Sequence, residues 1–167
     1  AIRNCCGRLE KAEGGTQIVV EASVTNVGKL AGKEVVQLYY SAPQGRLGKP
    51  ARALGAFAKT RCLQPGETQQ VTLRLAADSM ASYDDTGKIA KSAYVMEAGE
   101  YSFYLGNSVR NTEKVSFVYK EEADRVVLVL KERVAPRQLA KRMLADGSFE
   151  ELPVQAECKA ERFPGFV

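Results

Sequence analysis

The sequence predicts an all-β fold, an antiparallel β-sandwich followed by a short C-terminal helix and a tail. Segments in which apolar and polar residues alternate recur along the chain, and turn-forming residues separate them about every 8 to 12 residues. The 167 residues suffice for one core that removes about 70% of the unfolded surface from water. The content of 45% hydrophobic and 26% charged residues is that of a folded globular domain.

Two strands are expected first. In residues 16–26 the apolar side chains occupy every second position, which is the pattern of a half-buried strand. These side chains are Ile18, Val20, Ala22 and Val24. Residues 33–41 form a more continuous apolar run, so this second strand is expected at the centre of a sheet, covered on both faces.

Five more strands complete the predicted sandwich. Residues 63–67, with Pro65-Gly66 at their centre, predict a tight turn, and residues 83–88 predict a hairpin connection. The further strands are expected at residues 68–75, 89–96, 101–105, 115–119 and 126–130. We therefore place the sandwich at residues 16–133 and interpret residues 1–15 as an N-terminal connector.

The pattern changes in residues 134–167. Pro136 suits the first turn of a helix, and Gly147 suits the position just after its last turn. The apolar residues between them recur at helical spacing, at Leu139, Met143 and Leu144. A short helix and a connector tail are expected here.

The charge pattern argues against two classes of partner. The net charge of +4 comes from 24 basic and 20 acidic residues that are interspersed along the chain. A protein that binds nucleic acid would gather its basic residues on one face, so no nucleic acid is expected. No run of about 18 apolar residues occurs, so no membrane is expected either.

Four cysteines, Cys5, Cys6, Cys62 and Cys158, have neither the spacing of a zinc site nor that of a disulfide-rich scaffold. Free thiols are expected, which favours a reducing compartment such as the cytoplasm, although the sequence leaves the localisation open. Cys62 is expected to be a half-buried structural residue rather than a nucleophile.

The sequence contains no histidine, which excludes Ser-His-Asp and Cys-His catalysis within this chain and removes the commonest zinc ligand. Three groups of acidic residues could in principle act on a glycosidic bond, but each suits a turn or a solvated connection better. They are Asp84 with Asp85, Glu97 with Glu100, and Glu121 and Glu122 with Asp124. No glycine-rich phosphate motif is present. We therefore predict no catalytic residue, no cofactor or cofactor-binding residue, and no metal ligand.

Eight aromatic residues could form a platform for stacking on sugar rings. They are Tyr39, Tyr40, Phe57, Tyr83, Tyr94, Tyr101, Phe103 and Tyr104. Alternation assigns Tyr101 and Phe103 to the core, and tryptophan is absent from the sequence. Core packing is therefore favoured over a carbohydrate platform.

An ordered set of motifs between about Thr16 and Ser108 resembles the fibronectin type III-like domain of family-3 glycoside hydrolases, a group that includes β-glucosidases. The motifs are residues 24–28 (VTNVG), 31–40 (AGKEVVQLYY), Lys49-Pro50, Leu54 with Phe57 and Lys59, 63–67 (LQPGE), Tyr83-Asp84, 99–101 (GEY) and 105–108 (LGNS). Ala56, Tyr94 and Ala98 stand where that family commonly has Gly, Trp and Pro, which implies a divergent subfamily.

The resemblance implies an immunoglobulin-like, fibronectin type III-like sandwich that is a non-catalytic ancillary module of a β-glucosidase-like parent enzyme of carbohydrate metabolism. In that family the catalytic residues lie in other domains, so the expected partners are the catalytic domains of the same parent chain, and a loop could also reach the oligosaccharide substrate. The alternative is a free-standing module that binds carbohydrate or protein. The residues after about Lys131 resemble a connector, which suggests a parent in which catalytic sequence follows the sandwich.

Overall fold

The computed structural model describes residues 1–131 and 140–152. Within these residues the chain forms strands and a single short 3-10 helix, η1 (Ala77–Met80). The strands are β1 (Ile2–Ala12), β2 (Gly15–Thr25), β3 (Val35–Ser41), β4 (Ala53–Lys59), β5 (Thr68–Ala76), β6 (Ser82–Asp84), β7 (Ala93–Met96), β8 (Gly99–Ser108), β9 (Asn111–Glu121), β10 (Arg125–Val129), β11 (Lys141–Met143) and β12 (Phe149–Glu151).

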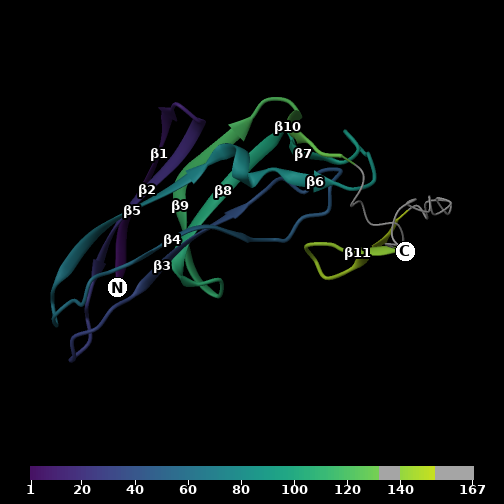
Figure 1. Ribbon diagram of the computed structural model, residues 1–167. Helices are drawn as coiled ribbons and strands as arrows, with labels where there is room; N and C mark the ends of the chain where they lie inside the picture. Colours follow the sequence, from purple (N-terminus) through teal and green to yellow (C-terminus); the bar gives the residue numbers. More distant parts are fainter. Residues whose placement is uncertain (132–139, 153–167) are drawn as a thin grey trace, which may run out of the picture.

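Two antiparallel sheets form the body of the molecule (Figure 1). The three-stranded sheet has the order β1-β2-β5, and the four-stranded sheet has the order β4-β3-β8-β9. This arrangement confirms the predicted all-β sandwich of fibronectin type III-like character. The second predicted strand is β3, and it lies at the centre of its sheet between β4 and β8, as its continuous apolar run indicates.

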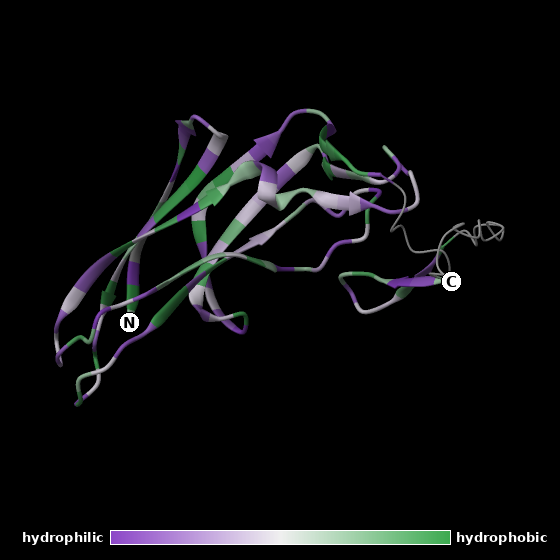
Figure 2. Ribbon diagram, in the orientation of Figure 1, coloured by the Kyte–Doolittle hydropathy of each residue, from purple (hydrophilic) through white to green (hydrophobic). Residues whose placement is uncertain are grey.

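The inward faces of the two sheets share one hydrophobic core. Apolar residues alternate with polar ones along the strands, as Figure 2 shows, because successive side chains point to opposite faces. Tyr101 and Phe103 of β8 are both 0% exposed, which confirms the core role predicted for them. They pack against Tyr119 and Phe117 of β9, with ring centroids 5.9 and 5.7 Å apart. With its own core, the module meets the requirement for folding as an independent unit.

A third sheet of order β10-β7-β6 lies at one end of the sandwich, where β7 leads into the start of β8 (Figure 1). The strand predicted at residues 89–96 is shorter than expected and covers only Ala93–Met96. Residues 87–90 instead turn around the side chain of Asp84, to which their backbone N–H groups donate. The Asp84 side chain, rather than a neighbouring strand, is thus the hydrogen-bond acceptor for this backbone.

The prediction of a connector at residues 1–15 is wrong, because Ile2–Ala12 forms β1 and pairs along β2. The register shifts between Arg3 and Cys6, which interrupts the alternation that sequence reasoning relies on. Ile2 packs against the core, and Gly7 closes on Phe117 of β9 so tightly that an added Cβ would lie 2.7 Å from the Phe117 Cβ. The first strand is therefore part of the sandwich.

The predicted helix is also wrong where the structure describes it. Residues 132–139, which include Pro136 and Leu139, lie outside the described residues, but Lys141–Met143 is strand β11 and pairs with β12. Gly147 adopts a φ of +85° in the hairpin turn, where the Leu144 N–H donates to Ser148 O at 2.8 Å. Glycine with positive φ serves a helix end and a hairpin turn equally well, so the residue does not distinguish them.

The packing of β1 leads to a test with a matched pair of glycines. Gly7→Ala places a methyl group against Phe117 and is expected to lower the free energy of unfolding by about 1–3 kcal/mol. Gly14→Ala, in the turn before β2, meets nothing within 4 Å and is expected to leave stability nearly unchanged. Urea denaturation of the two variants measures the difference, and equal stability would show that β1 does not pack on β9.

Candidate functional site

Asp84 organises the loop between β6 and β7. Its side chain is fully buried, and its two carboxylate oxygens accept four backbone N–H donors, from Gly87 at 2.8 Å, Lys88 at 3.0 Å, Ile89 at 2.7 Å and Ala90 at 2.9 Å. Burial acts to raise the pKa of this carboxyl, but the four donors outweigh burial and hold the pKa below its usual range. Asp84 is therefore an ionised structural acceptor with no free lone pair directed at solvent.

Asp85 attaches the β11–β12 hairpin to the same loop. The guanidinium of Arg142 in β11 donates to Asp85 Oδ1 and to Glu150 Oε2, each at 3.1 Å. Lys88 of the loop forms an ion pair with Glu150 of β12. Asp84 therefore binds the backbone of its own loop, whereas Asp85 binds Arg142 of the hairpin, and the two do not form a catalytic pair.

Glu97 and Lys49 form a buried ion pair beneath the loop of residues 43–50. Both side chains are about 3–4% exposed. The Glu97 carboxylate also accepts the backbone N–H of Arg46 at 2.6 Å and that of Leu47 at 3.2 Å, and Lys49 Nζ donates to Pro43 O at 2.7 Å. One carboxylate and one ammonium group therefore fix this loop from both ends.

The other acidic candidates lie apart from one another, and several of them bind separate partners. Glu100 is exposed on β8, away from the buried position that Glu97 occupies. Glu121 accepts the Tyr119 hydroxyl at 2.8 Å and Arg125 Nε at 3.1 Å, and Asp124 accepts the backbone N–H of Ala98 at 2.9 Å. A further ion pair joins Glu122 to Lys120 at 3.5 Å. The structure brings none of the three candidate groups together as a pair of free carboxylates facing a common space.

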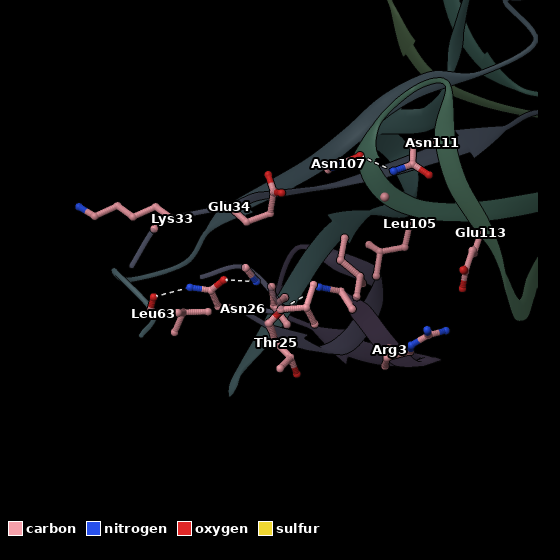
Figure 3. Close-up of a pocket in the computed structure, with 17 residues that line it drawn as sticks. Arg3, Thr25, Asn26, Lys33, Glu34, Leu63, Leu105, Asn107, Asn111 and Glu113 are labelled. Carbon is pink, nitrogen blue, oxygen red and sulfur yellow. Dashed lines mark hydrogen bonds between the residues drawn. The ribbon is translucent and has the colours of Figure 1, made fainter. Parts of the chain in front are cut away.

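A cleft of about 400 Å³ opens at the other end of β8, where the sheets separate (Figure 3). Its polar side chains brace the surrounding loops. Asn26 Nδ2 donates to Leu63 O at 2.8 Å and to Leu30 O at 2.9 Å, and Asn111 Nδ2 donates to Asn107 Oδ1 at 2.8 Å. These residues hold the ends of the strands in place, which is a structural task.

The thiols and aromatic residues are placed as follows. Cys62 is exposed and lies just before the turn at residues 63–67, so the prediction that it is half-buried is wrong. Cys6 is also an exposed free thiol, whereas Cys158 lies outside the described residues. Of the other aromatic candidates, Tyr83 and Tyr94 pair on the third sheet with ring centroids 5.4 Å apart. The rest belong to the four-stranded sheet: Tyr39 is buried, Tyr40 packs against the core, Tyr104 is partly exposed and Phe57 is exposed.

Residues 1–131 and 140–152 contain no helix with the length and apolar character that a membrane span requires. The same residues contain no cluster of three or more Cys, Asp or Glu side chains that could hold a metal ion.

The fold belongs to the class of fibronectin type III-like sandwiches. Among the described residues, the acidic side chains form no catalytic dyad. Residues 34–109 match the family described as "Fibronectin type III-like domain". Over these residues the chain is similar to that domain, and the relatives and solved structures that match it are β-glucosidases.

Three relatives carry this assignment. Beta-glucosidase A of Butyrivibrio fibrisolvens is 57% identical over 136 residues, which cover 81% of this chain but 16% of the relative. The structure of a β-glucosidase from Paenibacillus barengoltzii matches 96% of this chain with a TM-score of 0.83 and 47% identity, over 19% of its own length. β-Glucosidase 3B from Thermotoga neapolitana matches 75% with a TM-score of 0.63 and 32% identity. The chain thus spans less than one fifth of the length of each of these three β-glucosidases.

Asp84 provides a pH-dependent test of the loop. Asp84→Asn keeps the size of the side chain but replaces one acceptor oxygen with an NH2 donor that faces two of the four N–H groups, and is expected to lower the free energy of unfolding at pH 7 by about 2–3 kcal/mol. Because the folded-state pKa of Asp84 is depressed, its contribution is present above its unfolded pKa of about 4 and is lost as the pH falls through the lower folded value. The stability difference between wild type and variant, measured by urea denaturation from pH 7 to pH 3, should therefore shrink below about pH 4. A constant difference over this range would contradict the assignment.

The Lys49–Glu97 pair is tested by a double-mutant cycle. Glu97→Gln leaves a buried ammonium group without its counter-charge and is expected to cost about 3–5 kcal/mol of stability. Combining it with Lys49→Met removes the unpaired charge and should recover a large part of that loss. Glu100→Gln, at the exposed position nearby, is the control and should stay within about 0.5 kcal/mol of wild type.

Proposed function

We propose that this module belongs to a β-glucosidase and supports its catalytic domains by packing against them. The observation that carries the proposal is the match of 96% of the chain to a segment that makes up 19% of a β-glucosidase chain. The acidic candidates of this segment form no pair of free carboxylates among the described residues: Asp84 and Glu97 are buried acceptors, and Asp85 is paired with Arg142. What it can add is a rigid surface for the rest of the polypeptide.

Within this proposal, contact between the module and an oligosaccharide substrate stays a prediction. The loop of residues 43–50 suits it best, because Glu97 and Lys49 fix its backbone while Gln44 and Arg46 remain exposed. A hollow of about 700 Å³ lies between this loop and the β11–β12 hairpin. A preorganised loop of this kind can present side chains to a ligand with little loss of conformational entropy.

An activity assay tests the proposal directly. The 167-residue chain alone is expected to show no hydrolysis of aryl β-glucosides, whereas the full-length parent should hydrolyse them. Removing the module from the parent should reduce activity together with thermal stability, because the surface it covers becomes exposed to water. Turnover by the purified chain alone, free of contaminating enzyme, would overturn the non-catalytic assignment.

The alternative function, free-standing binding of carbohydrate, is tested with the same protein. Affinity electrophoresis and calorimetry on soluble glucans and xylans should detect no binding by the isolated chain. A dissociation constant of about 1 mM or tighter would favour the binding module instead.

A further inference from the structure

The two outward faces of the sandwich differ in chemistry. On the three-stranded sheet, Arg8 and Arg74 lie opposite Val19 from either side, and their side chains cover it so that Val19 is 0% exposed. Arg8 pairs with Glu21 at 2.8 Å and with Glu10 at 2.8 Å, and Glu10 also pairs with Arg74. This network of charges is the ordinary solvated face of a sandwich.

The outward face of the four-stranded sheet carries a group of apolar and aromatic side chains instead. Register places Leu54 of β4, Tyr39 of β3 and Tyr104 of β8 side by side in one row across three strands. Phe57 of β4 pairs with Gln37 of β3, which lies two residues before Tyr39. Leu54 is 51% exposed and Phe57 is 70% exposed, so two large apolar side chains of this face are left in contact with water.

Polar groups around these residues are already satisfied, which makes the face rigid. The Arg52 guanidinium lies 4.0 Å from the centre of the Tyr104 ring and donates to Thr112 Oγ1 at 2.6 Å. Tyr39 donates its hydroxyl to Gln37, and Gln37 Nε2 donates to Asn107 O at 3.0 Å. Side chains that are already held by such contacts lose little entropy when another apolar surface covers them.

Strand β4 adds an independent argument, because it is an edge strand of its sheet. Over Ala53–Lys59 its only charged residue is Lys59. Soluble proteins normally protect an edge with charged residues, proline or a covering segment, since an apolar edge invites association. β4 has one register shift against β3 and one lysine at its end, so most of this edge has no charged residue or proline of its own, which favours a covering segment.

We propose that Leu54, Phe57 and Tyr104 form the surface on which the module docks to the catalytic part of its own parent polypeptide. The inference rests on the proposed function and adds which face is used. The matched β-glucosidase chains are about five to six times longer than this segment, so the parent supplies an occupant in every molecule. Arg52, Lys59 and Lys114 border the surface, so the partner surface should be apolar with acidic residues at its rim.

Exposed apolar residues on β10 carry no comparable argument. Val129 and Leu130 are exposed but lie within three residues of the segment 132–139, which is outside the described residues. Leu128 of β10 is nevertheless a useful comparison, because it is 51% exposed, the same fraction as Leu54.

Hydroxyl-radical footprinting of the full-length parent and of the 167-residue chain tests the surface. Oxidation of Leu54 and Phe57 is expected to be at least about fivefold slower in the parent than in the isolated chain, because a docked surface is removed from solvent. Protection of these two residues supports the inference whatever happens at Leu128. Protection of Leu128 without protection of Leu54 and Phe57 would overturn the inference but leave the packing function standing, and protection of none of them would overturn both.

A variant with Leu54→Ser and Phe57→Ser separates docking from folding. In the isolated chain these exposed substitutions should leave the thermal unfolding midpoint nearly unchanged, whereas in the parent they should lower the transition of the module. Leu128→Ser is the matched control and should not affect that transition in the parent. Sedimentation of the isolated chain tests a second copy as the occupant, and slower oxidation of Phe57 by added soluble glucan tests a carbohydrate; a positive result in either, without protection in the parent, would overturn the inference.

Discussion

Most of the molecule is organised around strand β8 and its pairing with β3. In that pairing Phe103 lies opposite Tyr40 and Leu105 lies opposite Leu38, so the centre of the four-stranded sheet and the centre of the core coincide. β8 also pairs with β9 along its other edge. It begins two residues after Glu97, at the third sheet, and ends at Ser108, next to Asn107 of the cleft.

The charged side chains near β8 stabilise the fold rather than take part in a reaction. Near the third sheet, the carboxylates of Glu97 and Asp84 accept backbone N–H groups of loops that do not pair with any strand. A buried carboxylate is stable there because several N–H donors or an ammonium group compensate its lost hydration. The same commitment removes it from acid/base catalysis, which needs a carboxylate that can approach a substrate and exchange a proton. Acidic residues can therefore be numerous in a module that has no catalytic task.

An element of this structure could be predicted from the sequence when the residues that stabilise it lie close together along the chain. Alternation identified β2, β5 and the core positions of Tyr101 and Phe103, because burial on one face imposes a period of two on a regular strand. It missed β1, where the register shifts and charged residues dominate, since the support for that strand comes from Phe117 over one hundred positions away. It also misread residues 141–147 as a helix. The partners of that segment, Asp85 and Lys88 through Glu150, are distant in sequence and leave no periodic trace.

The site was harder to predict than the fold for a related reason. In the sequence, Leu54 and Phe57 belong to a motif but are assigned to no strand, because a short apolar stretch without alternation does not show which face of a sheet its side chains occupy. Pairing with β3 shows instead that they point away from the core, opposite Tyr39 and Gln37. In a module that folds around its own core, outward apolar side chains on an edge strand contribute little to its own stability. Exposing these side chains to water has a free-energy cost, which is offset only when another surface covers them. The outward face, which takes no part in the core, is therefore the face that docks the module to the rest of its chain.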